Sequence, residues 1–260
     1  MAAKLPTSNE PIAITASMCL RLLVEGLLPL AFDWQQMLAV MAIGSLLVGN
    51  LAAIAQTNLK RMLAFSTISQ MGFLLLGMLS GVVNGNQLNA ESAYSAAMFY
   101  AITYVLTTLA AFGVIMLLAR EGHESEEISD LAGLNQRSPL YAGVMAVVMF
   151  SLAGLPPLVG FYAKLSVLQA LISSQQTTYL ILAIFAVLMS LVGAFYYLRI
   201  VKVMYFDAPL SPVHAITAPA DAKVVLTING ALILLLGIMP GGLMTLCTQS
   251  ISSIVKTLGS

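Results

Sequence analysis

The sequence predicts an all-α polytopic membrane protein with about seven transmembrane helices, one of them broken at Pro156-Pro157. Of its 260 residues, 59% are hydrophobic and only 8% are charged, whereas a soluble domain has about 25% charged residues. The mean hydropathy is +0.93. Because a soluble protein of this size could not hide so much apolar surface from water, the chain belongs in a membrane.

Seven apolar segments have the length of about 20 residues that a membrane span requires. In lipid, every backbone N–H and C=O group must be paired within its own segment, so each segment is expected to be a helix. The segments cover approximately residues 12–30, 36–55, 62–83, 94–119, 140–173, 178–198 and 224–247.

Two opposite charges lie one turn apart in the first segment. Arg21 and Glu25 are separated by four positions, so they share a face of the helix. An ion pair would make both charges tolerable in the membrane, and arginine cannot release a proton at accessible pH. Glu25 is also the only carboxylate placed well inside a predicted span. It is therefore the candidate acidic partner within this chain for a buried cation.

The third segment is preceded by two basic residues, Lys60 and Arg61. Basic residues at this place are typical of cytoplasmic anchors. The polar residues Ser66, Ser69 and Gln70 follow at positions i, i+3 and i+4, so they share one face. Two interpretations stay open for them: polar groups that hold helices together, or the lining of a path for water and protons.

The fourth segment carries a stripe of hydroxyl-bearing side chains along one helical face. The stripe consists of Tyr100, Thr103, Tyr104 and Thr107. Helix packing is the favoured interpretation of these residues, ahead of any redox role.

The fifth segment is too long for a single straight span. Residues 140–173 would form a helix of about 50 Å, against a hydrocarbon core of about 30 Å. Pro156 and Pro157 lack backbone donors and clash with the preceding turn, and Gly154 and Gly160 lower the cost of irregular backbone. We expect two half-helices joined near mid-membrane, where the break is buried in protein or lines a hydrated cavity.

Lys164 lies about two turns beyond this break, too deep to be a simple end residue. Its own helix offers no acid, since the residues four positions away are Gly160 and Leu168. A partner must come from another helix, another subunit or water. One interpretation is a lysine that gains and loses a proton along a transfer path. The alternative is a snorkelling or ion-paired lysine that only fixes packing.

The basic residues of the connections predict the orientation of the chain. Eight of them fall on one side of the membrane, against Lys256 alone on the other. The richer side is expected to be cytoplasmic. With seven helices, the N-terminus is then expected in the cytoplasm and the C-terminus on the outer side. The eight residues are Lys4, Lys60, Arg61, Arg120, Arg137, Arg199, Lys202 and Lys223.

Several classes of function find no support in the sequence. Cys19 and Cys247 lie in apolar runs, where cysteine is most often a small buried hydrophobe. His123 and His214 lie far from any cysteine or paired carboxylate, so we expect no metal site. No glycine-rich phosphate loop and no nucleophile–base pair is present. The net charge is zero, and we expect no nucleic-acid partner.

Four stretches of the chain resemble a known family in their order and spacing: "GNLAAIAQTNLKRMLAFSTISQMGFLLLG", "FYAITYVLTTLAAFG", "SLAGLPPLVGFYAK" and "FYYLRIVKVMYF". They are similar to the antiporter-like membrane subunits of proton-pumping NADH–quinone oxidoreductase, respiratory complex I, and among these to the C-terminal half of subunit N. The broken helix with its lysine is shared more widely, with multisubunit sodium/proton antiporters.

The resemblance implies two inverted five-helix repeats, each forming a half-channel around a broken helix. The second repeat would cover about residues 36–206, within a transmembrane helical domain of residues 11–260 that follows a non-matching cytoplasmic segment of residues 1–10. Lys164 then falls on the lysine of the second broken helix, which the resemblance implies to pass protons toward the outer side.

The resemblance also implies cellular context. The chain would lie in the bacterial inner membrane, surrounded by lipid and by other membrane-arm subunits. The complex would translocate protons while electrons pass from NADH to quinone. This chain would bind no cofactor itself, since flavin and iron–sulfur clusters belong to partner subunits and quinone is reduced where the two arms meet.

The chain departs from the family pattern at three places. Ile12 stands where the family usually has a lysine, and Gln70 stands where a histidine is often seen. The other helices of the first repeat are missing, together with their glutamate and lysine. The expectation is therefore a truncated or mis-started subunit N. Two alternatives stay open: a subunit of a multisubunit sodium/proton antiporter, and a non-functional fragment of subunit N.

Overall fold

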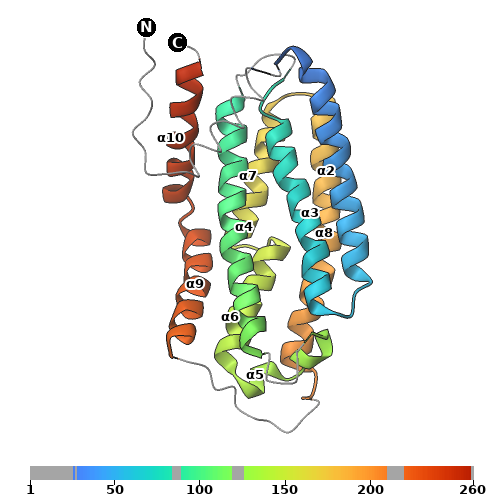
Figure 1. The fold of residues 1–260 in the computed structure, drawn as a ribbon, viewed down its shortest axis with the longest axis vertical. Helices are drawn as coiled ribbons and strands as arrows, with labels where there is room; N and C mark the ends of the chain where they lie inside the picture. Colours follow the sequence, from blue (N-terminus) through green and yellow to red (C-terminus); the bar gives the residue numbers. More distant parts are fainter. Residues whose placement is uncertain (1–25, 27, 84–88, 119–125, 210–219, 259–260) are drawn as a thin grey trace.

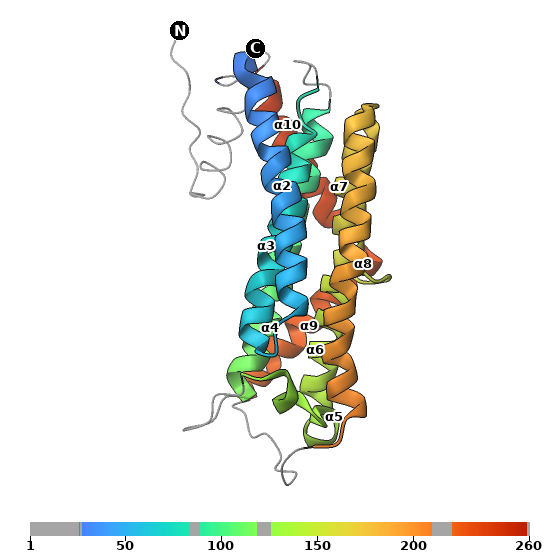
Figure 2. The same cartoon turned by 90° about the vertical axis from the view of Figure 1, so that its right-hand side faces the viewer.

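The computed structural model describes residue 26 and residues 28–83, 89–118, 126–209 and 220–258, which form a bundle of helices along one long axis (Figures 1 and 2). These described residues contain no strand, and an isolated bridge joins Asn58 and Glu127. The elements are η2 (Leu28–Leu30), α2 (Ala31–Ile54), α3 (Leu59–Leu79), α4 (Ala90–Leu118), η3 (Ile128–Leu131), α5 (Leu134–Arg137), α6 (Pro139–Ala153), α7 (Val159–Ser173), α8 (Thr177–Phe206), α9 (Ala220–Ile238) and α10 (Gly241–Leu258).

Large apolar side chains are exposed on the outside of the bundle. Among the described residues, five helical segments are long and apolar enough to cross a membrane: η2 with α2, then α3, α4, α8 and α9. Large apolar side chains point outward from α2 and α8, such as Phe32 and Leu191, which are 71% and 65% exposed. Apolar exposure on this scale fits a membrane environment. The prediction of an all-α polytopic membrane protein is confirmed.

Four of the predicted segments correspond to single helices, α2, α3, α4 and α8, apart from their ends. The largest difference is at α8, which continues to Phe206 instead of ending near residue 198. The extension places Arg199 and Lys202 on the helix, and Arg199 donates to the carbonyl of Gln56 at 3.4 Å. The first predicted segment, residues 12–30, lies almost entirely outside the described residues.

α4 is the central helix, in contact with α3, α6, α7, α9 and α10. The helices α2, α4 and α8 run from the end of the bundle that holds α10 to the end that holds α5, and α3, α6, α7, α9 and α10 run the opposite way (Figure 1). We call these two ends the α10 end and the α5 end. α7 begins in the middle of the bundle and continues toward the α10 end.

The predicted break in the fifth segment is confirmed, since α6 ends at Ala153 and α7 begins at Val159. Gly154 ends α6 in the left-handed conformation, with φ of 84°. Its N–H donates to the carbonyl of Ser151 at 3.0 Å, and the N–H of Leu155 donates to that of Phe150 at 3.0 Å. This pair of bonds is a Schellman motif, which a left-handed glycine favours.

The start of α7 is hydrogen-bonded to the end of α6 through Gly160, the second glycine predicted at the break. Gly160 donates its N–H to the hydroxyl of Ser151 at 3.2 Å. A Cβ on Gly160 would lie 2.7 Å from the carbonyl carbon of Ser151, which no side chain can tolerate. The absence of a side chain at Gly160 therefore lets the two half-helices touch.

The prediction of one helix over residues 224–247 is wrong, because α9 ends at Ile238 and α10 begins at Gly241. Pro240 lies between them and has no N–H to continue the helical hydrogen bonds. Its carbonyl instead accepts the N–H of Met244 at 3.0 Å, which starts α10. The seventh segment is broken by a proline, as the fifth one is.

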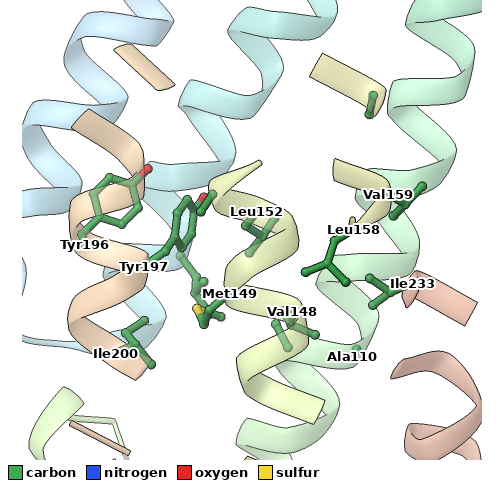
Figure 3. Packing of buried hydrophobic residues seen from close by; sticks show 14 of the residues in the cluster. Ala110, Val148, Met149, Leu152, Leu158, Val159, Tyr196, Tyr197, Ile200 and Ile233 are labelled. Atoms are coloured by element: carbon green, nitrogen blue, oxygen red, sulfur yellow. The ribbon is translucent and has the colours of Figure 1, made fainter. Parts of the chain in front are cut away.

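The two breaks lie against each other through Gly237 of α9. A Cβ on Gly237 would overlap the carbonyl oxygen of Pro157 and would lie 2.7 Å from the Cα of Leu158. Figure 3 shows Leu158 and Val159 beside Ile233 of α9. The backbone of α9 thus packs directly on the backbone between α6 and α7.

The α5 end is closed by contacts between the α2–α3 turn and the segment before η3. Lys60 forms an ion pair with Glu126 at 2.9 Å, and the N–H of Leu59 donates to the Glu126 carbonyl. Asn58 caps α3 by accepting the N–H of Arg61 at 3.0 Å. Lys60 and Arg61 therefore lie at one end of the bundle, as expected of anchors, while their cytoplasmic location stays a prediction.

Gly237→Ala should destabilise the protein, because the new methyl group has no space beside Pro157 and Leu158. Overpacking of this kind costs about 1–3 kcal/mol. Thermal melting of the purified membrane protein measures the loss. Gly143→Ala on α6 is the matched control, since nothing lies within 4 Å of its Cβ position. Equal melting temperatures for the two variants would contradict the contact between the breaks.

Candidate functional site

Lys164 is buried in the second turn of α7, with 8% of its surface exposed. Its Nζ donates to the carbonyls of Leu152 and Ala153 at 2.9 and 3.1 Å, and to the hydroxyl of Ser190 at 2.9 Å. An ammonium group has three donors, so the site satisfies all of them. Each of these partners is neutral. Two belong to the broken segment itself, and the third comes from α8.

The break makes these two carbonyls available. The last four carbonyls of a helix have no partner within it. In α6 the Schellman motif pairs those of Phe150 and Ser151, which leaves Leu152 and Ala153 for Lys164. The C-terminus of a helix also carries partial negative charge that stabilises a nearby cation. The end of α6 is therefore a cation site built from backbone.

Gly154 fits this site in two ways. It adopts the positive φ that ends α6, and it leaves space for the lysine stem. A Cβ at this position would lie 3.0 Å from Cδ and 3.3 Å from Nζ of Lys164. On another side, the ring of Phe73 on α3 lies 5.3 Å from Nζ, within the range of a cation–π interaction.

Gln70 of α3 is buried next to the lysine and shares one of its acceptors. Its amide nitrogen donates to the Leu152 carbonyl at 3.2 Å and to the hydroxyl of Tyr197 at 3.0 Å. Its amide oxygen accepts the hydroxyl of Tyr100. Figure 3 shows Tyr197 of α8 beside Leu152 at the end of α6. Gln70 therefore links α3, α4, α6 and α8 around the site.

A cavity of about 20 Å³ adjoins the lysine, which is room for about one water molecule. We call it the lysine cavity. The hydroxyls of Thr103 and Thr107 donate to their own helix, to Phe99 and Thr103 carbonyls at 2.9 and 2.7 Å, so their oxygens are left as acceptors. The cavity is lined by Lys164, Gln70, Tyr100, Thr103, Tyr104 and Thr107. The predicted stripe on α4 thus faces the lysine.

The three polar residues predicted to share a face of α3 differ in their distance from the lysine cavity. All are buried, but only Gln70 lines the lysine cavity. Ser66 donates to the Leu63 carbonyl of its own helix at 2.8 Å. The backbone of Ser69 packs against α2, where a Cβ on Gly49 would lie 2.6 Å from its nitrogen. The side chain of Ser66 also interacts with Tyr197, and both interpretations of Ser66 and Ser69 stay open.

Some predicted residues lie outside the described part of the chain, and some site residues were missed. Arg21 and Glu25 belong to the first group, so pairing of Lys164 with Glu25 stays a prediction. Ser190 and Tyr197 belong to the second. Ser190 is a lone hydroxyl in the apolar middle of α8. This position in the sequence could have identified it as a candidate site residue. Among the described residues, no group of three or more His, Cys, Asp or Glu could hold a metal ion.

The fold and the site define a helical membrane protein that holds a buried lysine at a break in mid-bundle. Residues 6–190 match the family model described as "NADH:quinone oxidoreductase/Mrp antiporter, TM". This match covers more than half of the chain, so the chain belongs to that transmembrane family. The match begins within the N-terminal segment in which the quoted stretches showed no resemblance.

Curated relatives are similar along the whole chain. NADH-quinone oxidoreductase subunit N of Polaromonas naphthalenivorans is 76% identical over 259 residues, covering 99% of this chain and 52% of the relative. The protein of the same name from Herminiimonas arsenicoxydans is 57% identical, covering 100% of this chain and 51% of the relative. The chain spans about half the length of the curated relatives it matches.

Solved structures have the same fold. A chain of respiratory complex I from Thermus thermophilus, solved with bound aureothin, is 32% identical with a TM-score of 0.68, covering 81% of this chain and 45% of that chain. A chain of the Mrp complex from Dietzia sp. DQ12-45-1b has a TM-score of 0.74 at 21% identity, covering 93% and 51%. At that identity the second likeness shows the fold alone.

Gly154→Ala should destabilise the protein by about 1–2 kcal/mol for the left-handed backbone, with a further cost from crowding Lys164. Thermal melting measures the total. A double-mutant cycle with Lys164→Ala separates the two parts, because removal of the lysine stem relieves the crowding and leaves the backbone strain. Equal costs in both backgrounds would show that Gly154 makes no room for the lysine.

Proposed function

We propose that this chain is part of a membrane-arm subunit of NADH–quinone oxidoreductase and contributes to proton translocation coupled to electron transfer from NADH to quinone. Family membership and the relatives named subunit N support this proposal. So does the 32% identity to a chain of respiratory complex I. The proposal concerns the complete assembly, since the chain spans about half of those relatives.

In this proposal Lys164 carries the proton. The observation that supports this role is that its three hydrogen-bond partners are all neutral. A carboxylate partner would hold the ammonium permanently charged, but the partners found among the described residues are two carbonyls and a hydroxyl. A hydroxyl both donates and accepts. Ser190 accepts from the ammonium and, after a rotation of its O–H, donates to the neutral amine. The two carbonyls accept the remaining N–H groups, so both protonation states are fully hydrogen-bonded.

Release of the proton needs an acceptor next to Nζ. The lysine cavity has room for about one water molecule, and the threonine oxygens of α4 can accept its hydrogens. One N–H of the ammonium leaves its hydrogen bond to Ser190 and turns to that water, and transfer then breaks this N–H bond and forms an O–H bond on the water. Gln70 cannot relay the proton itself, because an amide nitrogen donates hydrogen bonds without a free lone pair to accept one. Gln70 instead holds the Leu152 carbonyl in place.

The surroundings follow from the same proposal. The chain lies in a bacterial inner membrane beside other membrane-arm subunits, with flavin and iron–sulfur clusters in partner subunits and quinone as the substrate of the complex. The α5 end faces the cytoplasm, since Lys60, Arg61, Arg137, Arg199 and Lys202 gather there. The N-terminus is then cytoplasmic and the C-terminus periplasmic.

Lys164→Ala should reduce proton pumping and quinone reduction by roughly tenfold or more, because a positioned proton-transfer group is lost. NADH-driven acidification of inverted membrane vesicles and quinone reduction rates measure the effect, and native electrophoresis checks that the complex assembles. Lys164→Arg is the matched control. It should lose pumping as Lys164→Ala does, since arginine keeps the charge but does not release the proton.

Full pumping in an assembled Lys164→Ala complex would overturn the role of Lys164. Loss of growth at high sodium on deletion of the gene, without loss of NADH oxidation, would instead support a sodium/proton antiporter. Co-purification with flavin and iron–sulfur proteins supports the respiratory complex.

Ser190→Ala should reduce pumping by roughly tenfold, since a hydrogen bond to a charged group contributes about 1.5–3 kcal/mol and the neutral amine also loses its donor. Ser190→Thr keeps the hydroxyl and should retain most of the activity. The pumping rate as a function of pH should change in the alanine variant and not in the threonine variant. Unchanged pumping and an unchanged pH profile in Ser190→Ala would contradict the two-state role of this hydroxyl.

A further inference from the structure

A pocket of about 440 Å³ lies at the α5 end of the bundle, between the α2–α3 turn, the η3 region and the end of α8. We call it the α5-end pocket. Figure 2 shows α8 along one side of the bundle, with its last turns beside α5. The polar residues of the pocket wall are Arg199 and Asp207 from the end of α8, Glu127 and Ser129 from the η3 region, and Thr57 from the α2–α3 turn.

Arg199 brings a positive charge to this pocket that the described part of the chain does not neutralise. Its guanidinium donates to the carbonyl of Gln56 at 3.4 Å, which is long for a hydrogen bond. Asp207 pairs with Lys202 at 3.3 Å, and no carboxylate of the described residues lies within 4.0 Å of the Arg199 guanidinium. A guanidinium has five N–H donors, and its planar fork matches the oxygens of a phosphate group. The pocket therefore has a binding group for an anion.

The position of Arg199 along α8 corresponds to the edge of the hydrocarbon core. Arg199 is the first charged residue of this helix. The uncharged residues 177–198 before it extend about 33 Å, close to the thickness of about 30 Å of a hydrocarbon core. Phosphate groups of phospholipids lie at the same depth, in the headgroup region just outside that core. The anion that Arg199 meets there is a lipid phosphate.

An apolar face of α8 leads away from Arg199 into the membrane. Four large apolar residues share this face at steps of three or four positions, and each is more than half exposed. They extend over roughly 16 Å along the helix, about half the thickness of the hydrocarbon core and thus the depth of one leaflet. An acyl chain can lie along this face. The four residues are Phe195, Leu191, Leu188 and Ile184.

The charges of the pocket distinguish between phospholipid headgroups. Its wall carries one basic residue, Arg199, and two acidic ones, Glu127 and Asp207, so an additional negative charge on the lipid is not favoured. Glu127 is exposed, and its carboxylate accepts the backbone N–H of Asp130, which leaves further acceptor sites. A primary ammonium has three donors for such sites, whereas the quaternary ammonium of choline has none. Phosphatidylethanolamine joins a phosphate to a primary ammonium.

We propose that the α5-end pocket binds the headgroup of one phosphatidylethanolamine molecule, with its phosphate on Arg199, its ammonium on Glu127 and an acyl chain along the apolar face of α8. The bound lipid neutralises the guanidinium and links the end of α8 to the η3 region. This site depends on the membrane fold and is independent of proton transfer by Lys164.

Photo-cross-linking tests the site in the full complex, reconstituted in phosphatidylcholine vesicles with a small fraction of phosphatidylethanolamine that carries a diazirine in its acyl chain. Mass spectrometry should locate the label on residues 184–195 of α8. Arg199→Gln should reduce this labelling roughly tenfold, because the charge-assisted hydrogen bonds to the phosphate are lost. Lys202→Gln is the matched control, since Lys202 is a basic residue of the same helix end outside the pocket wall. Native electrophoresis checks that each variant assembles.

Competition in the native complex tests the headgroup without any substitution. Unlabelled phosphatidylethanolamine should displace the label several-fold more effectively than phosphatidylglycerol at the same mole fraction. Glu127→Gln should remove this preference while labelling through Arg199 remains.

Three results would count against the site. Equal labelling of α8 in the native complex and in Arg199→Gln would overturn it. Equal competition by the two unlabelled lipids would overturn the ammonium contact and with it the choice of phosphatidylethanolamine. Absence of label from α8 in the native complex would mean that a protein segment covers this face instead of lipid. None of these results depends on whether Lys164→Ala pumps, so the site and the proton-transfer function are tested separately.

Discussion

Two backbone carbonyls, those of Leu152 and Ala153, determine how this bundle can hold a buried cation. They are available as acceptors because α6 ends in mid-bundle. The Schellman motif pairs the two carbonyls before them, those of Phe150 and Ser151. A charge in a membrane protein needs a partner, and here the partner is a helix end. The position of α7, the left-handed Gly154 and the shared contact of Gln70 all follow from presenting those carbonyls to Lys164.

Close backbone contacts hold this arrangement together. Without a strong hydrophobic force between helices in lipid, membrane bundles use small residues that let main chains touch. Gly160 brings the start of α7 to Ser151, and Gly49 brings α2 to Ser69. Several hydroxyls donate to carbonyls of their own helix, as those of Thr103 and Thr108 do. Other hydroxyls join helices, as that of Tyr196 on α8 does by donating to Asn50 of α2.

Much of the fold could be predicted from the sequence, and less of the site. Apolar length and the prolines at 156 and 157 determine the spans and the first break. Pro240 carried the same signal, but the apolar segment around it was short enough to pass as one span. Lys164 and Gln70 were recognisable as polar residues in apolar surroundings. Their partners were not, because backbone carbonyls have no side-chain identity and the packing of Ser190 against α7 depends on how α8 sits in three dimensions.

The contact of Gly237 with the main chain of Pro157 and Leu158 has a mechanical consequence. Side chains at an interface can change rotamer and absorb a displacement, whereas two main chains in contact transmit it. A displacement of α9 at Gly237 is therefore passed directly to the backbone between α6 and α7. The position of α9 is in this way coupled to the carbonyls at the end of α6 that hold Lys164.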